Sequence, residues 1–433
     1  MRTIRRILVV ALVAAVILPL LHANAQTPVE INFYFPEATA NNAQAIFEEY
    51  AAKFSEQYPN IKVNVAYQGS YTDNRTKIQT ELQAGAGPDV AVMLATDLFS
   101  FIEDDYLVPL QPKIDALTDS KAWVDDFFPA FWANSLDEQG AIWSVPFQRS
   151  TPVLYYNKAM FAEAGLDPEK APRNQAELVE FGKKLTTADR WGVWVPTEGF
   201  PIWLFTGAAI ANGQNISTND PAVVTFNTPA VQKSLEFWLA LSKEHKVMPE
   251  GILSWGETPA NFAAGKVAMA FHTTGSLTRI LNESPFEVGV GFLPFGEGNA
   301  NGEGYGAPTG GGNIYLFKNS SPEKQEAAWL WAQFLASPEI QADWGAKTGY
   351  VAARISAWEL DPLKSLVAEK PQYAVARDQL AYAQKEFSAY RTIDLQGIIN
   401  TTLSNILSGK ETDIPAALKT AQDQIDSLLA EYK

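Results

Sequence analysis

The sequence of 433 residues contains no cysteine. Disulfide bonds, cysteine-ligated metals and thiol nucleophiles are therefore excluded, and so is a lipid anchor attached to a cysteine. Without covalent crosslinks the fold must be held together by a large hydrophobic core. A chain of this length can supply such a core, most economically as two domains.

Histidine is scarce, and basic residues are outnumbered by acidic ones. Only His22, His245 and His272 are present, with no HExxH or His-x-His spacing, so we predict neither a metal nor a cofactor. Lys and Arg number 33 against 49 Asp and Glu, and the formal net charge is −16. This charge argues against nucleic acid or an anionic membrane as a partner. It leaves a small anionic ligand possible, because distant surface charges are screened within about 8 Å.

Motifs for catalysis are missing or incomplete. There is no G-x-S-x-G, and the S-x-x-K match at 321–324 reads as a helix start, with Ser321 as cap and Pro322 in the first turn. The G-x-K-T fragment in 345–349 lacks the upstream glycine of a phosphate-binding loop. A carboxylate pair for glycoside hydrolysis cannot be selected among so many acids. We predict no catalytic residue and no enzymatic activity.

The first 26 residues resemble an export signal. Arg2, Arg5 and Arg6 precede an apolar run over 7–21, and Ala23-Asn-Ala25 provides small residues for cleavage. The run is shorter than the roughly 20 residues of a membrane span, although an uncleaved anchor is the alternative. We predict a signal peptide at 1–25, cleaved near Ala25, and a periplasmic protein that is not a lipoprotein. Secretion to the medium is the other possibility.

Hydrophobic periodicity predicts an α/β protein. Residues 29–35, 61–65 and 89–94 read as strands separated by helices at 46–58 and 76–84, a pattern typical of a mostly parallel sheet. A second series of strands and helices follows from residue 141 onwards. The last hundred residues are predicted to be mostly helical, at 322–335, 338–344, 371–387, 395–407 and 414–432.

One stretch carries a family resemblance. Residues 146–158 (PFQRSTPVLYYNK) and 164–169 (AGLDPE) resemble the family 1 extracellular solute-binding proteins of ABC importers, and among these the glycerol-3-phosphate-binding proteins. The resemblance covers nearly the whole chain after the signal. It continues in QGSY (68–71), GSL (275–277), GVGFLP (289–294), GGG (310–312) and KTGY (347–350).

The resemblance implies a bilobal periplasmic-binding-protein fold of type II, which is maltose-binding-like. Two α/β lobes would be joined by a hinge, with the ligand in the cleft between them and buried by closure. We expect the N-lobe at 26–140 plus 286–337. The C-lobe is expected at 141–285 plus 338–433.

The family's ligand positions can be carried over residue by residue. Tyr71 corresponds to a contact of the glycerol part, and Ser150 to a contact of the phosphate. Thr273 supplies a hydroxyl, and the backbone N–H of Gly311 faces the phosphate. Tyr350 and Arg391 would complete the anion end, because hydroxyls, a glycine amide and an arginine fork are the donors that a phosphate needs.

The sequence departs from the family pattern at the other end of the site. Ala95 stands where the family has a Glu, and Asp97, two residues on, is expected to take over that role. The family's W-x-x-W pair falls on Thr197 and Phe200 by counting, with Trp203 close by, whereas Trp191 and Trp194 match the pattern several residues earlier. We expect Phe200 and Trp203 as cleft aromatics.

The sequence therefore predicts a monomeric substrate-binding protein of an ABC importer. It would bind glycerol-3-phosphate or a related glycerophosphodiester and deliver it to the permease subunits in the membrane. A sugar-binding or oligosaccharide-binding protein of the same family is the alternative. A secreted phosphoester hydrolase is the remote one.

Overall fold

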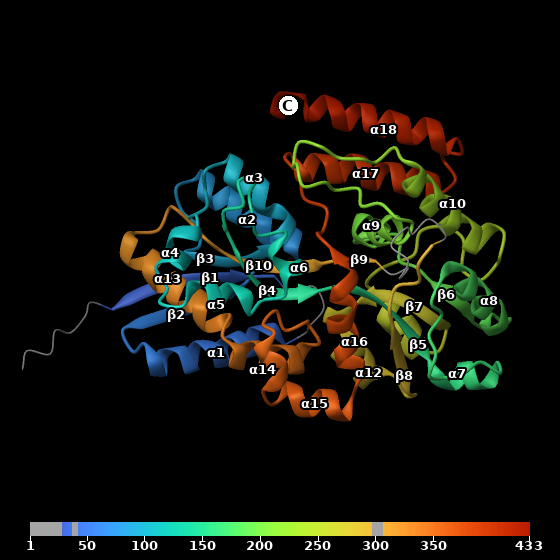
Figure 1. The fold of residues 1–433 in the computed structure, drawn as a ribbon, viewed down its shortest axis with the longest axis horizontal. Coiled ribbons are helices and arrows are strands. Elements are labelled where there is room, and N and C mark those ends of the chain that lie inside the picture. Colours follow the sequence, from blue (N-terminus) through green and yellow to red (C-terminus); the bar gives the residue numbers. More distant parts are fainter. Residues whose placement is uncertain (1–27, 37–41, 297–305) are drawn as a thin grey trace, which may run out of the picture.

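The structure is a computed structural model that describes residues 28–36, 42–296 and 306–433. The predicted signal peptide lies outside these residues. Two α/β lobes lie side by side, each built around its own sheet (Figure 1). The first sheet has the order β2-β1-β3-β10-β4 and the second the order β6-β7-β5-β8, while a short pair, β11-β9, lies between them. The predicted bilobal α/β fold is confirmed.

The strands of the first sheet are β1 (Val29–Phe35), β2 (Ile61–Tyr67), β3 (Val90–Leu94), β4 (Val145–Ser150) and β10 (Gly310–Leu316). The helices along the chain of the first lobe are α1 (Ala43–Gln57), α2 (Tyr71–Gln83), α3 (Leu98–Glu103), α4 (Gln111–Asp115), α5 (Ser120–Asp125), α6 (Pro129–Trp132), α13 (Pro322–Leu335), α14 (Pro338–Thr348) and α15 (Leu363–Glu369). Short 3-10 turns are η1 (Ala95–Asp97) and η3 (Ser356–Glu359).

The strands of the second sheet are β5 (Pro152–Asn157), β6 (Trp191–Trp194), β7 (Val267–Thr273) and β8 (Val288–Gly291). Its helices are α7 (Lys158–Glu163), α8 (Gln175–Leu185), α9 (Pro201–Ala211), α10 (Pro229–Lys243), α11 (Thr258–Ala263), α12 (Leu277–Glu283), α16 (Gln372–Gln379), α17 (Thr392–Leu407) and α18 (Ile414–Leu428). The remaining pieces are β9 (Ala307–Pro308), β11 (Ala383–Gln384), η2 (Thr274–Ser276), η4 (Leu380–Tyr382) and η5 (Ala430–Tyr432).

The sheets are mixed, so the prediction of a mostly parallel sheet is correct only in part. β1 pairs in parallel with β2 and β3, as expected for successive βαβ units. β10, however, runs antiparallel to both β3 and β4, and β5 runs antiparallel to both β7 and β8. These antiparallel strands come from chain segments that cross between the lobes, which local periodicity does not reveal.

The crossings differ from the predicted lobe boundaries. β4 ends the first sheet at Ser150 and β5 enters the second at Pro152, so the chain crosses at Thr151 and not at residue 141. β8 belongs to the second sheet, so 286–291 lie in the second lobe. Conversely, Trp344 of α14 stacks on Phe47 of α1 at 5.2 Å, which places α14 in the first lobe.

One predicted helix is correct only in its first half. The helix predicted at 371–387 ends at Gln379 as α16, the turn η4 follows, and the chain is extended from Ala383. Ala383 and Gln384 pair in parallel with Ala307 and Pro308, and the Thr309 N–H donates to the Gln384 carbonyl at 2.8 Å. Tertiary strand pairing thus overrides local helical preference in a segment that borders the cleft.

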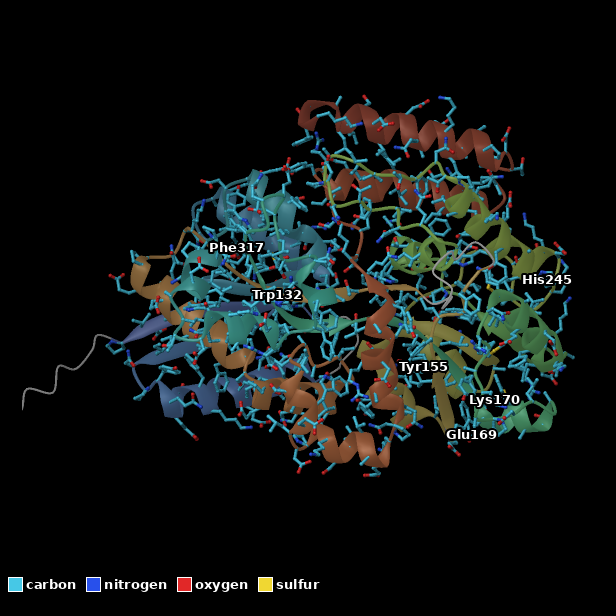
Figure 2. The ribbon with its side chains drawn as sticks, viewed as in Figure 1. Trp132, Tyr155, Glu169, Lys170, His245 and Phe317 are labelled. Atoms are coloured by element: carbon cyan, nitrogen blue, oxygen red, sulfur yellow. The ribbon has the colours of Figure 1, made fainter. Side chains whose placement is uncertain are left out.

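The two lobes have dense apolar interiors. Tyr155 of β5 and Phe317 beyond β10 are fully buried, whereas Glu169 and Lys170 lie at the periphery of the second lobe (Figure 2). His245 lies toward the outside of the same lobe, apart from the buried His272. The described residues hold no group of three or more His, Asp or Glu that could bind a metal. In the described ranges no helix has both the length and the apolar character needed to span a membrane.

Candidate functional site

A cavity lies between the lobes, where segments of both sheets end. About 380 Å³ of space there is free of protein atoms, including the part that opens to solvent. The first lobe contributes residues at the ends of β3, β4 and α14, and the second contributes residues from β7 and α9. The lining residues are Tyr71, Leu94, Ser150, Phe200, Trp203, Trp255, Thr273, Gly311, Tyr350 and Glu386.

Tyr71 is placed by the start of α2. Ser70 caps the helix by accepting from the Asp73 N–H, and the Asp73 carboxylate accepts from the Ser70 N–H in return, which forms a capping box. Gly69 precedes the cap with a φ of +83°, a backbone conformation that favours glycine. The QGSY motif thus fixes a turn that directs Tyr71 into the cavity wall.

Gln148 joins the two cleft tyrosines. This buried side chain of β4 donates through Nε2 to the Tyr71 hydroxyl at 2.6 Å and to the Tyr350 hydroxyl at 3.2 Å. Tyr71 comes from α2 and Tyr350 from the loop after α14, so one amide positions hydroxyls from distant segments. Gln148 lies within the family-like stretch, but its role is not apparent without the fold.

We expect Gln148→Leu to weaken the site. Leucine fills similar space but leaves both hydroxyls without this donor, so the free energy of unfolding should fall by about 1–3 kcal/mol. Ligand affinity should fall about tenfold, since each factor of ten corresponds to roughly 1.4 kcal/mol. Urea unfolding and calorimetric titration measure the two effects. The exposed Gln57→Leu is the matched control, and equal behaviour of the two variants would contradict a positioning role.

Glycines of β10 allow the backbone to approach the cavity. Gly311 has a φ of +90°, and a Cβ there would lie 2.1 Å from the Gln148 carbonyl oxygen. A Cβ at Gly310 would lie 2.5 Å from the Trp203 ring. The GGG motif is therefore required both by conformation and by the close packing of the aromatic wall.

Three aromatic side chains form one wall. The Trp255 ring centroid lies 5.2 Å from that of Phe200 and 6.0 Å from that of Trp203, both edge to face. His272 stacks on Trp255 at 3.9 Å and its Nε2 lies 3.2 Å from the Trp255 carbonyl. Burial lowers the pKa of His272 to about 3, so this imidazole is a neutral support of the wall. Trp255 carries no motif that would have revealed it in the sequence.

Glu386 is the acidic member of the lining set, and sequence reasoning missed it because the residue fell in a predicted helix. Its Oε2 atom is buried and has no hydrogen-bond partner among the described residues. Burial raises the pKa of Glu386 to about 8, while Arg149 acts in the opposite direction and Asp97 adds to the rise. A carboxyl group with unused hydrogen-bonding capacity therefore borders the cavity.

Arg149 is fully buried next to Ser150. It donates through Nη1 to Asn313 Oδ1 at 3.0 Å and lies over the Phe131 ring at 5.1 Å. Its Nε and Nη2 atoms have no partner in the described part of the chain. Desolvation lowers the pKa of this guanidinium. Arg149 does not line the cavity but lies behind its wall, where its Nη1 is 3.4 Å from the carbonyl of the lining residue Gly311.

The structure brings together most of the residues that the sequence nominated. The members found in the lining set are Tyr71, Ser150, Thr273, Gly311, Tyr350, Phe200 and Trp203. Asp97 is not in that set: it is buried in η1 and forms an ion pair with Arg75 at 3.2 Å.

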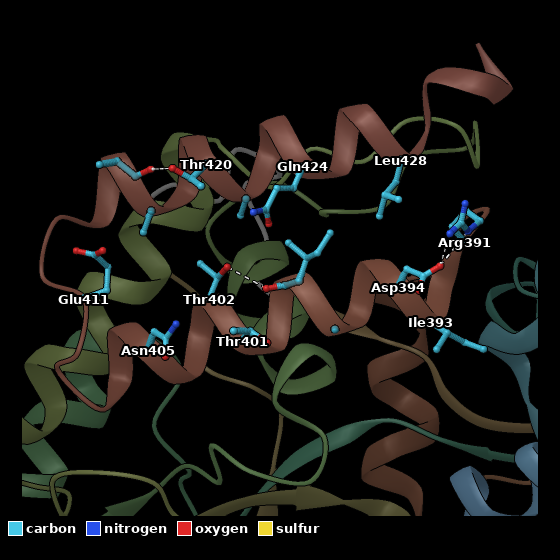
Figure 3. A pocket seen from close by; sticks show the side chains of 15 residues that line it. Arg391, Ile393, Asp394, Thr401, Thr402, Asn405, Glu411, Thr420, Gln424 and Leu428 are labelled. Carbon is cyan, nitrogen blue, oxygen red and sulfur yellow. Dashed lines mark hydrogen bonds and ion pairs between the residues drawn. The ribbon is translucent and has the colours of Figure 1, made fainter.

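The placement predicted for Arg391 is wrong. It lies at the start of α17 with a partly exposed side chain, paired with Asp394 at 2.8 Å and with Glu431 at 3.4 Å. Figure 3 shows Arg391 beside Asp394 at one end of a groove between α17 and α18, and this groove is separate from the interlobe cavity. Asp394 in the first turn of α17 and Glu431 in η5 together hold the guanidinium on the surface.

The fold and the interlobe cavity define the class of bilobal solute-binding proteins. The family described as Bacterial extracellular solute-binding protein matches residues 49–374. The chain belongs to this family, whose members bind small molecules and deliver them to the permease of an ABC importer.

The individual relatives share only about a quarter of their residues with this chain. The sn-glycerol-3-phosphate-binding periplasmic protein UgpB of Pectobacterium atrosepticum is 26% identical, over 97% of this chain and 96% of that protein. UgpB of Mycobacterium tuberculosis, solved with glycerophosphocholine, has a TM-score of 0.79 and 25% identity, covering 94% of this chain and 99% of that one. Maltose-bound MalE3 of T. maritima has the same TM-score at 23% identity, covering 92% of this chain and 100% of that one, and therefore speaks for the fold alone.

Proposed function

We propose that this protein captures a small, uncharged, hydroxyl-rich solute, a sugar or polyol, and presents it to an importer's permease. The composition of the cavity wall carries this proposal. Its polar side chains are the hydroxyls of Tyr71, Ser150, Thr273 and Tyr350 and the carboxyl group of Glu386. Among the described lining residues there is no Lys or Arg.

This wall matches the chemistry of a polyol. A ligand hydroxyl both donates and accepts, so it can pair with tyrosine and serine hydroxyls and also donate to a carboxyl oxygen. The aromatic wall of Phe200, Trp203 and Trp255 supplies an apolar surface for the C–H face of a sugar ring. Because the free space of about 380 Å³ includes the part that opens to solvent, the enclosed part of the cavity is smaller, which favours a small ligand.

We assign ligand contact to the gathered residues. Tyr71, Ser150, Gly311 and Tyr350 would hold the solute from the first lobe, and Thr273 from the second, with Phe200 and Trp203 beside it. Because the walls come from both lobes, binding would stabilise the closed arrangement, and opening about the crossings near Thr151 would release the solute. Asp97 would support the wall without touching the ligand.

A glycerophosphodiester is the second candidate. The relatives named for glycerol-3-phosphate, at 26–27% identity, and the glycerophosphocholine complex at 25% favour it. Hydroxyls and the Gly311 amide are suitable donors to a phosphate. The missing element is a cation that lines the cavity, since Arg391 is held elsewhere.

We also propose that the protein works in the periplasm as a monomer. The signal-like segment before Gln26 and the periplasmic relatives support export. Its partners would be the solute and the membrane subunits of the permease, and the protein itself would perform no chemistry.

A thermal-shift panel on the chain starting at Gln26 tests the proposed ligand class. It would contain monosaccharides, maltose, glycerol, glycerol-3-phosphate and glycerophosphocholine. A ligand at 100 times its Kd adds about 2.7 kcal/mol of stability, or roughly 3 °C for a domain of this size. We expect the rise with a neutral member. A rise confined to the two phosphoesters would establish the second candidate and reject the first.

A further inference from the structure

The backbone of Glu386 is fixed by side-chain hydrogen bonds, although the residue lies in an extended segment. Asn134 binds both backbone groups of Glu386: its Nδ2 donates to the Glu386 carbonyl at 3.0 Å, and its Oδ1 accepts from the Glu386 N–H at 2.9 Å. The Thr309 hydroxyl donates to the same Oδ1 at 3.2 Å. Glu386 thus lines the cavity on a backbone that is fixed by hydrogen bonds, which is what a ligand contact requires.

Charged groups of both signs act on this carboxyl. Arg149 on β4 attracts a negative charge there, and Asp97 in η1 opposes it, although Asp97 is itself paired with Arg75 of α2. Arg149 keeps two buried polar atoms without a partner in the described structure, and Glu386 keeps one. Each is at least nine-tenths buried, with exposures of 0% and 8%.

We propose that Glu386 is the specificity-determining residue of the cavity: its carboxyl group pairs with ligand hydroxyls and, when it is ionised, offsets the positive charge of Arg149, so that the cavity admits hydroxyls and rejects phosphate esters. This inference rests on the proposed function of the interlobe cavity. The cavity would select neutral solutes over anionic ones. Glu386 would have a ligand-facing role and Arg149 an indirect one.

Removal of the Glu386 carboxyl group would leave the charge of Arg149 behind the cavity wall. Arg149 lies behind the wall, with its Nη1 3.4 Å from the carbonyl of the lining residue Gly311, and its charge favours the ionised form of Glu386. In a buried site the Coulomb interaction between neighbouring charges is several times stronger than in water. Glu386→Gln keeps the shape and a hydrogen-bonding oxygen. At a pH at which the wild-type carboxyl is ionised, the variant leaves the charge of Arg149 uncompensated, and its cavity should attract an anion that the wild-type cavity rejects.

The test is a calorimetric titration with glycerol-3-phosphate at pH 9, above the pKa of about 8 that burial gives Glu386. We expect Glu386→Gln to bind glycerol-3-phosphate at least tenfold more tightly than the wild type. Glu359→Gln makes the same chemical change at an exposed acid of the first lobe and should have no effect. Equal affinity of wild type and Glu386→Gln would overturn the proposal.

A double variant identifies the source of the attraction. Glu386→Gln with Arg149→Met should lose the gained affinity, and retention of the gain would show that Arg149 is not its origin. Glu386→Ala serves as a second removal of the charge. Failure of both single variants to fold would also overturn the proposal, because a carboxyl that only selects ligands is not needed for folding.

The role of Glu386 and the proposed ligand class can be rejected independently of each other. A wild type that responds to no neutral solute rejects the sugar or polyol assignment, whatever Glu386→Gln does. A wild type that binds a neutral solute, combined with a Glu386→Gln variant that gains no phosphoester affinity, rejects only the role of Glu386.

Discussion

Trp203→Ala is expected to abolish most of the binding. Trp203 is nearly buried, its Nε1 donates to the Thr309 carbonyl at 2.8 Å, and its ring packs against Gly310. It comes from α9 of the second lobe, whereas Thr309 and Gly310 lie at the return to the first sheet. Removal of the indole therefore takes away both a ligand wall and a contact that joins the lobes.

The expected size of the effect follows from general values. A buried aromatic anchor at the centre of a binding site typically contributes 2 kcal/mol or more, so affinity should fall about 30-fold or further. Loss of a buried Trp also leaves a cavity and should lower the free energy of unfolding by about 3–5 kcal/mol. Calorimetric titration with the neutral ligand and urea unfolding measure these quantities.

Trp191→Ala is the matched control. Trp191 lies at the start of β6 and is 37% exposed, so the same chemical change should cost little stability and leave affinity unchanged. If Trp203→Ala binds with wild-type affinity under conditions in which it remains folded, the ligand does not bind in the interlobe cavity.

The stability of the protein is expected to decrease between pH 5 and pH 8 because of Glu386. The pKa of this carboxyl is raised from 4.5 to about 8 in the fold, primarily by burial. Between those values the folded protein keeps a proton that the unfolded chain releases, so each rise in pH favours the unfolded chain. The loss is complete above pH 8 and is on the order of 3–5 kcal/mol, at 1.36 kcal/mol per pH unit.

Urea midpoints measured from pH 5 to pH 9 test this expectation. The decline should be clearly smaller in Glu386→Gln, which cannot ionise. His272 acts in the opposite direction below pH 6.5, because its lowered pKa makes acid favour the unfolded chain. The difference between wild type and Glu386→Gln cancels that contribution, and parallel curves for the two proteins would show that Glu386 does not titrate in this window.

Much of the site could be predicted from the sequence because local motifs carry it. The capping box before Tyr71, the strand end at Ser150 and the glycines of β10 are set by short-range geometry. The structure brings Tyr71, Ser150 and Gly311 to one cavity, where the family resemblance led us to expect them. The same holds for strands with strong alternation, such as β1 and β2. These elements need little tertiary information to be recognised.

The residues that were missed depend on long-range packing. Glu386 enters the cavity only because β11 pairs with β9 and Asn134 clamps its backbone, and neither contact has a local signature. Trp255 is set by its stack on His272 from β7. Arg391 fails for the converse reason: it is only five residues beyond Glu386 in sequence, but Asp394 and Glu431 hold it on the outer surface.

We expect a neutral solute to bind between the lobes and to contact Glu386, which selects it, whereas Arg391 takes no part in binding. Titration of that solute into Arg391→Ala and Glu386→Ala, side by side with wild type, tests it most directly. We expect Arg391→Ala to bind within about twofold of wild type and Glu386→Ala to lose about tenfold or more, a difference near 1.4 kcal/mol. Loss of binding in Arg391→Ala with wild-type affinity in Glu386→Ala would contradict the claim.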